Sequence, residues 1–120
     1  MARILVPLLI AAGVVIGFGM SGTATALGAN PLWATQVTFT GALAGTVLAL
    51  VGRLALRRRF RAGSGFAVLA MASYGVASLG KASFLASYAE NATAGQMWFY
   101  GWIGAATLAT AAIAMMLFRR

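Results

Sequence analysis

The chain has no cysteine and no histidine, and its 120 residues include one carboxylate side chain, that of Glu90. These absences exclude disulfide bonds, thiolate zinc sites and histidine-ligated haem, and a lone carboxylate cannot form a cage of ligands around a metal ion. The sequence also has no phosphate-binding glycine loop and no nucleophile with a histidine base. We therefore expect no metal, no cofactor and no enzymatic activity.

Charge is also missing over a long stretch. No charged residue occurs from Ile4 to Gly52, whereas five arginines follow within nine positions: Arg53, Arg57, Arg58, Arg59 and Arg61. An uncharged run of about 49 residues is too long for a soluble core helix and suffices for two membrane crossings of about 20 residues each. The hydrophobic content of 62% and the mean hydropathy of +0.90 exceed what a soluble domain can bury. The sequence therefore predicts an integral membrane protein surrounded by the lipid bilayer.

Turn-forming residues divide the chain into four spans within a single transmembrane domain, 1–120. Breaks are expected at three clusters: Gly28-Ala29-Asn30-Pro31, Gly63-Ser64-Gly65 and Glu90-Asn91-Ala92-Thr93. The spans between them are expected at about 4–27, 32–56, 65–89 and 95–118. The predicted fold is an all-α membrane protein in which four transmembrane helices form an up-and-down bundle.

Basic residues are distributed unevenly between the two ends of these spans. Eight of the nine lie beside the N-terminus, in the loop between the second and third spans, or at the C-terminus. Because positively charged loops stay in the cytoplasm, both termini are predicted to be cytoplasmic, in a bacterial or archaeal cytoplasmic (inner) membrane. This topology explains the net charge of +8 without nucleic acid as a partner. An interfacial aromatic belt is expected at the opposite boundary, from Trp33, Tyr88, Trp98, Tyr100 and Trp102.

Lys81 is the one basic residue that the topology does not explain, because it falls within the third span. An ammonium group there costs on the order of 2.5 kcal/mol or more unless it finds water, a partner or a headgroup. It could bind an anionic ligand, such as a carboxylate or a lipid phosphate, in a cavity between helices, or it could snorkel to the interface. Glu90 is a poor counter-ion, since nine helical residues separate the two by about 13.5 Å and half a turn.

Two further groups of side chains are candidates for the wall of a ligand site. Trp98 and Trp102 lie four residues apart on one helix face, where they could form an aromatic wall or belong to the interfacial belt. Gln36 and Thr40 could line a polar cavity with neighbouring threonines, or such hydroxyls could bond to their own helix. The candidate ligand-binding residues are therefore Lys81, Gln36, Thr40, Trp98 and Trp102.

Small residues recur at a four-residue spacing in three of the spans. This spacing lets helix backbones approach closely in lipid, either within the bundle or between chains. The pairs expected to pack helices are Gly13 with Gly17, Gly41 with Gly45, and Gly101 with Ala105.

The layout resembles half of a drug/metabolite transporter superfamily protein, the EamA-like and small multidrug resistance group. The similarity lies in four spans in a chain of this length, in Asn30-Pro31-Leu32-Trp33 opening the second span, and in Ala82-Ser83-Phe84-Leu85-Ala86-Ser87-Tyr88 followed by Ala92-Thr93-Ala94. The first span lacks the membrane-embedded glutamate of small multidrug resistance proteins, so no functional residue is transferred. The strong charge bias also disagrees with the antiparallel homodimers of that group.

Two classes of function stay open at this point. The resemblance implies a transporter-like subunit that handles a small organic or lipid-linked solute, as a homo-oligomer or with other membrane subunits. The alternative is a structural or accessory subunit of a larger membrane complex, which packs through its glycine faces and has no site of its own. A regulatory membrane protein is a third option.

Overall fold

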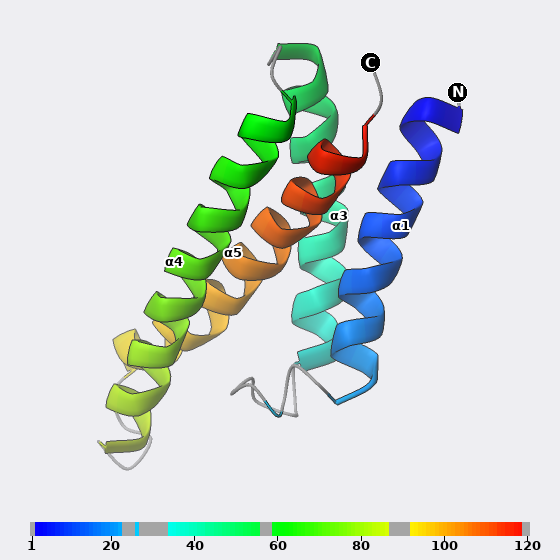
Figure 1. Cartoon of the computed structure of the whole chain (residues 1–120). Helices are drawn as coiled ribbons and strands as arrows, with labels where there is room; N and C mark the ends of the chain where they lie inside the picture. Colours follow the sequence, from blue (N-terminus) through cyan, green and yellow to red (C-terminus); the bar gives the residue numbers. More distant parts are fainter. Residues whose placement is uncertain (1, 23–25, 27–33, 56–58, 87–91, 119–120) are drawn as a thin grey trace.

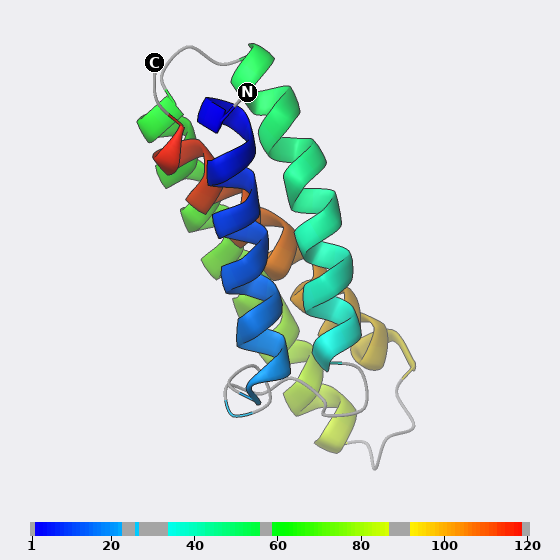
Figure 2. The ribbon, with the colours of Figure 1, turned by 90° about the vertical axis from the view of Figure 1, so that its right-hand side faces the viewer.

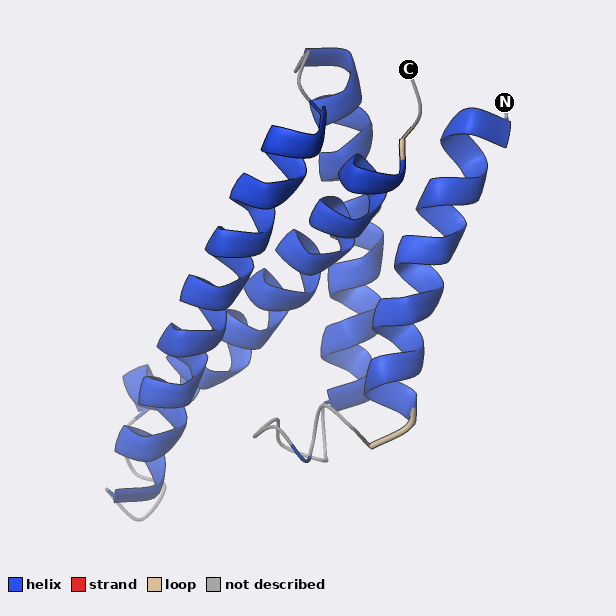
Figure 3. Ribbon diagram, viewed as in Figure 1, coloured by secondary structure: helices blue, strands red, loops and turns tan. Residues whose placement is uncertain are grey.

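Helix is the only regular structure in the part of the chain that the computed structural model describes, which comprises residues 2–22, 26, 34–55, 59–86 and 92–118 (Figure 3). Four long helices make up most of it: α1 (Ala2–Met20), α3 (Ala34–Ala55), α4 (Arg59–Ala86) and α5 (Ala92–Leu117). Each contains a stretch of at least 18 residues that is long and apolar enough to cross a membrane. The all-helical fold with four such helices is therefore confirmed.

The end of α1 corrects the first predicted span. The helix ends at Met20 and not near residue 27. Its last turn closes with the Ser21 N–H donating to the Gly17 carbonyl at 2.9 Å. Gly22 then adopts a left-handed backbone angle, φ +83°, which glycine reaches without a steric cost and which commonly ends a helix. Gly22, which the predicted first span included, therefore ends helix α1.

The start of α4 corrects the third span in the opposite direction. The break expected at Gly63-Ser64-Gly65 is wrong, because α4 begins at Arg59 and runs through these residues. Gly63 is buried where a Cβ atom would lie 2.6 Å from Met116 Cγ and 3.1 Å from the Ala112 carbonyl oxygen of α5. Close helix packing, and not a turn, therefore accounts for this glycine. α5 likewise begins at Ala92, slightly before the predicted position 95.

Several residues used in the sequence analysis lie outside the described part of the chain. They are Gly28-Ala29-Asn30-Pro31, Trp33, Arg57, Arg58, Tyr88, Glu90, Asn91, Arg119 and Arg120. Of the arginines grouped between 53 and 61, Arg61 is exposed in the first turns of α4. Arg53 is half-buried in the last turn of α3, with its guanidinium carbon 5.0 Å from the centre of the Phe118 ring.

Helix α5 lies at the centre of the arrangement and contacts α1, α3 and α4. α4 packs along α5, and α1 packs along α3 (Figures 1 and 2). Contacts of α5 with α3 and α1 join these two helix pairs. The fold is 50 Å long and 24 by 17 Å across. Its length is comparable to a bilayer with its headgroups, about 40–45 Å. Large apolar side chains are exposed on all four helices, for example Leu9, Leu43, Leu79 and Met97, as expected for surfaces that contact lipid.

Glycines in α3 and α5 allow the closest approaches between helices. A Cβ atom added to Gly45 would lie 2.5 Å from the Thr107 carbonyl oxygen, and one added to Gly101 would lie 2.7 Å from the Ala77 Cβ. Gly41 is in equally close contact with Ala106. These glycines therefore lie at helix contacts inside the bundle.

The other predicted packing pair occupies a different environment. Gly13 and Gly17 are exposed on α1, and a Cβ atom added to either would meet nothing within 4 Å. Ala105 is buried, at 9% exposure, beside the cavity described below. Of the predicted small-residue pairs, the one on α1 is therefore still available for contact with another chain.

A hydrogen bond links the two helices of the α4–α5 pair. The Ser73 hydroxyl donates to the Gly101 carbonyl at 2.8 Å. We expect Ser73→Ala to lower the free energy of unfolding by about 0.6 kcal/mol, the average for such bonds between membrane helices. Titration of the purified protein with sodium dodecyl sulfate, followed by circular dichroism, measures this change. Ser78→Ala is the matched control, because Ser78 is exposed on the same helix; equal losses for both variants would contradict the prediction.

Candidate functional site

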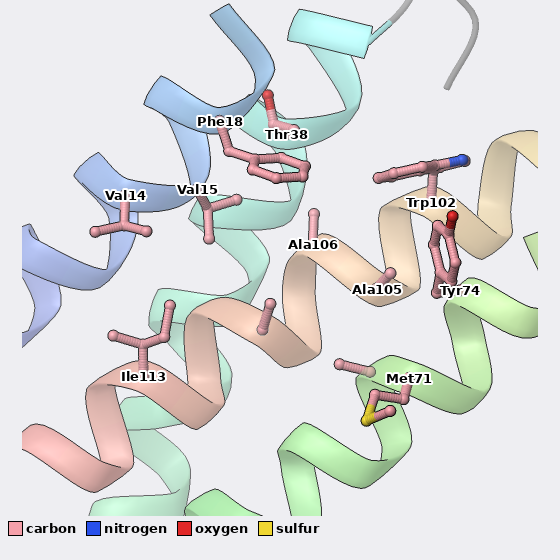
Figure 4. Close-up of a pocket in the computed structure, with 12 residues that line it drawn as sticks. Val14, Val15, Phe18, Thr38, Met71, Tyr74, Trp102, Ala105, Ala106 and Ile113 are labelled. Carbon is pink, nitrogen blue, oxygen red and sulfur yellow. The ribbon is translucent and has the colours of Figure 1, made fainter. Parts of the chain in front are cut away.

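A cavity of about 380 Å³ lies between the two helix pairs. This volume falls within the range of ligand pockets, about 300–1,000 Å³. All four helices contribute to its wall (Figure 4). α1 supplies Val14, Val15 and Phe18, while α5 runs along one side and contributes small residues such as Ala106 and Ala109. The short side chains of Ala106 and Ala109 thus leave a space that larger side chains of all four helices surround.

The mouth of the cavity lies between α1 and α4. Val14 of α1 and Met71 of α4 belong to the wall, yet their side chains are 53% and 74% exposed. Both residues lie near the middle of their helices. Since the middle of a membrane-spanning helix faces the hydrocarbon, this opening would face lipid chains and not water.

Polar groups are scarce along the cavity wall. Thr38 is almost fully buried, at 1% exposure, and its hydroxyl donates to the Thr35 carbonyl of its own helix at 3.0 Å. Tyr74 and Trp102 lie edge to face with ring centres 5.3 Å apart, and they occupy the end of the cavity opposite Ile113 (Figure 4). An apolar wall whose buried hydroxyl is already bonded favours an apolar occupant.

Aromatic side chains continue beyond this end of the cavity and lead to Lys81. Trp98 belongs to the same buried cluster as Trp102, and its ring centre lies 5.8 Å from that of Phe84. The Lys81 Nζ lies 5.8 Å from the centre of the Trp98 ring, within the range of a cation–π interaction. Lys81 is half-buried, and the described residues include no carboxylate side chain. Within the described ranges, its ammonium group therefore meets an aromatic face and no acid.

The structure brings together three of the five predicted ligand-binding residues. Trp102 lines the cavity, Trp98 packs in the same buried cluster as Trp102, and Lys81 lies beside the Trp98 ring. Gln36 and Thr40 are exposed on α3 and are not part of the cavity wall. The helix turns Thr38 inward instead, because positions two residues apart on a helix point in nearly opposite directions.

The interfacial belt expected from the aromatic residues is wrong for both candidate tryptophans. Trp98 is 7% exposed and Trp102 is 5% exposed, because both turn inward and pack in a cluster with Ala77 of α4. Tyr100, between them in sequence, is exposed. The alternative of an aromatic wall describes the two tryptophans better than a belt does.

Most of the cavity wall was missed by the sequence analysis. Val14, Met71 and Tyr74 are common residues of apolar spans, and hydropathy does not separate positions that face a cavity from positions that face lipid. A weak signal existed in α5, where Ala105, Ala106 and Ala109 repeat small residues on neighbouring turns. Such a row indicates close packing or space, and only the arrangement of the partner helices decides which.

No protein-family model, curated protein or solved structure matches the chain. The function therefore has to be inferred from the cavity, whose wall all four helices form, and from Lys81 near its aromatic end.

Proposed function

We propose that this protein is a membrane subunit that binds a small apolar or lipid-linked solute, which enters the cavity sideways from the hydrocarbon of the bilayer. The observation that carries the proposal is the apolar cavity whose mouth is formed by exposed Val14 and Met71 at mid-helix. A solute of this kind is concentrated in the membrane, so an opening toward lipid is the expected route. The relationship to half of a drug/metabolite transporter is part of this proposal.

The proposal includes one orientation in the membrane. The four helices cross as an up-and-down bundle, with both termini cytoplasmic in a bacterial or archaeal inner membrane. Two features support this orientation. The start of α1 and the end of α5 lie at the same end of the fold (Figure 1), and eight of the nine basic residues occur in the sequence near the N-terminus, around the connection from α3 to α4, or at the C-terminus. Because positively charged loops stay in the cytoplasm, the proposal assigns this end of the fold to the cytoplasmic side of the membrane.

Further helices complete the proposed pathway. Four helices leave the cavity open on the side between α1 and α4, so transport would need a second copy or another membrane subunit to close it. Gly13 and Gly17 supply a surface on α1 where a helix backbone can approach closely. Native mass spectrometry in mild detergent identifies that partner.

The second candidate function is an accessory subunit that uses this glycine surface and binds no solute. The exposure of Gly13 and Gly17 favours it, because a Cβ atom added to either glycine would meet nothing within 4 Å. It predicts that the protein co-purifies with other subunits and that filling the cavity changes nothing. Binding of an apolar probe in the cavity separates the two candidates.

The test is a substitution that fills the cavity. Ala70 of α4 is half-buried in the cavity wall, whereas Ala72 is exposed on the same helix and is not part of the wall. We expect Ala70→Phe to weaken binding of a dibrominated stearate methyl ester at least about tenfold, while Ala72→Phe leaves it unchanged. Bromine quenches nearby indoles, so binding is followed by tryptophan fluorescence in a Trp33→Phe background that retains Trp98 and Trp102.

Two results would contradict the proposed function. The first is quenching that does not saturate in the parent protein, because the probe would then act only from the detergent. The second is equal binding by Ala70→Phe and Ala72→Phe, because the site of binding would then lie elsewhere.

A further inference from the structure

Resting on the proposed function, we propose that Lys81 binds the acidic headgroup of the occupant. The ligand is then an anionic amphiphile, with its apolar chain in the cavity and its carboxylate or phosphate beside the Lys81 ammonium group. This assigns a substrate class to the cavity and a role to the one basic residue that topology does not explain.

The spacing along α4 places the charge at a suitable distance from the cavity. Lys81 follows Tyr74 by seven residues, which puts the two on the same helix face about 10.5 Å apart along the axis. Tyr74 and Trp102 form the end of the cavity, with ring centres 5.3 Å apart. Trp98, one turn before Trp102, lies between this end and the Lys81 Nζ. An elongated molecule that extends about 10.5 Å beyond Tyr74 along α4 would therefore reach the level of the ammonium group.

The charge environment of Lys81 calls for an anion. The Nζ lies 5.8 Å from the Trp98 ring centre, and the side chain is half-buried beside apolar residues. The described residues contain no carboxylate, so the indole face is the compensation that the described fold provides. An aromatic face neutralises an ammonium group only in part, whereas a carboxylate or phosphate forms a charge-assisted hydrogen bond with it. Charge complementarity thus selects an acidic headgroup.

The depth of Lys81 also fits an amphiphile. Lys81 lies five residues before the end of α4 at Ala86, about 7.5 Å along the helix, whereas the mouth at Met71 lies near its middle. A headgroup near the end of the helix and a chain near its middle is the position that a lipid-like acid takes in a bilayer. A small free anion would contact Lys81 but not the cavity, and a neutral apolar compound would leave the ammonium group without its partner.

The test compares a carboxylate probe with its neutral ester. Dibrominated stearate and its methyl ester share the same chain, and both are followed by quenching of Trp98 and Trp102 in the Trp33→Phe background. The matched variant combines Lys81→Ser with Ser83→Lys, which keeps the net charge and moves the ammonium group to an exposed position two residues along α4. We expect this variant to bind the carboxylate about tenfold more weakly and to bind the ester as the parent does.

The outcomes separate this inference from the proposed function. An equal loss for both probes, or no loss for either, would overturn the role of Lys81 while saturable binding of the ester still supported the cavity. Lys81→Gln repeats the measurement if the double variant expresses poorly. Acetate and inorganic phosphate serve as competitors, and displacement of the carboxylate probe by either at millimolar concentration would show that a free anion suffices, which would overturn the amphiphile. If the ester fails to bind to the parent protein, the proposed function itself is wrong.

Discussion

Replacing Gly45 by alanine is expected to lower the free energy of unfolding by about 3 kcal/mol, although alanine is the better helix former. The added Cβ atom would lie 2.5 Å from both the Thr107 carbonyl oxygen and the Thr110 Cβ. Neither atom is the far end of a flexible side chain, so α3 and α5 must separate to make room. Separation also removes the neighbouring contact between Gly41 and Ala106. The loss therefore extends over more than one turn of the interface.

Gly17→Ala is the matched control for this substitution. Gly17 is exposed on α1, and an added Cβ atom would meet nothing within 4 Å. We expect the free energy of unfolding to stay unchanged or to rise by up to about 1 kcal/mol, the difference in helix propensity between the two residues. Both variants are compared by titration with sodium dodecyl sulfate at a protein concentration where the chain is monomeric. Similar stabilities would show that α3 and α5 are less closely packed than described.

Reversing the distribution of arginines is expected to invert the protein in the membrane. The orientation of small membrane proteins follows the lysines and arginines of their short loops. A variant with six arginines replaced by glutamine and four arginines introduced at the opposite ends of the helices carries more basic residues on the other side. We expect most of its molecules to have external termini, measured by alkaline phosphatase and green fluorescent protein fused to the C-terminus. The glutamine substitutions are at Arg57, Arg58, Arg59, Arg61, Arg119 and Arg120, and the introduced arginines replace Ala29, Asn30, Asn91 and Ala92.

Lysine in place of the same six arginines provides the control, because it keeps the charge and changes the side chain. This control should have the proposed cytoplasmic termini, with a fluorescent protein fusion that is bright and a phosphatase fusion that is inactive. Cytoplasmic termini in the glutamine variant would mean that hydrophobicity, and not charge, sets the orientation. Inversion of the lysine control would point to a contact specific to the guanidinium group of one of these six arginines.

Hydropathy was sufficient to predict four helices, because a run of about 20 apolar residues has few other interpretations. The helix ends were less accessible, since glycine has two opposed uses. Gly22 ends α1 with a left-handed backbone angle, whereas Gly63 continues α4 and is buried against α5. The residue type is the same at both positions, so the sequence alone does not distinguish the two roles. Only the presence of a partner helix beside Gly63 decides that the helix continues.

The candidate site was predictable where its residues are rare and not where they are common. Lys81, Trp98 and Trp102 were selected for their chemistry, and they lie together next to the cavity. Met71 was not selected, because a methionine in an apolar span has the same appearance whether it faces lipid or a cavity. Gln36 was selected for its polarity alone, and the phase of the helix turns it to the outside.

The central position of α5 has a consequence for how the protein is made. Helices leave the ribosome in chain order, and α5 is the last of the four to emerge. In the described fold α4 packs almost entirely on α5, so its small-residue face of Ser73, Ala77 and Gly80 enters the bilayer before its partner exists. During that interval the growing chain is open to pairing with foreign helices and to membrane proteases. A stop codon between positions 87 and 91 would thus produce a fragment without the helix that joins the other three.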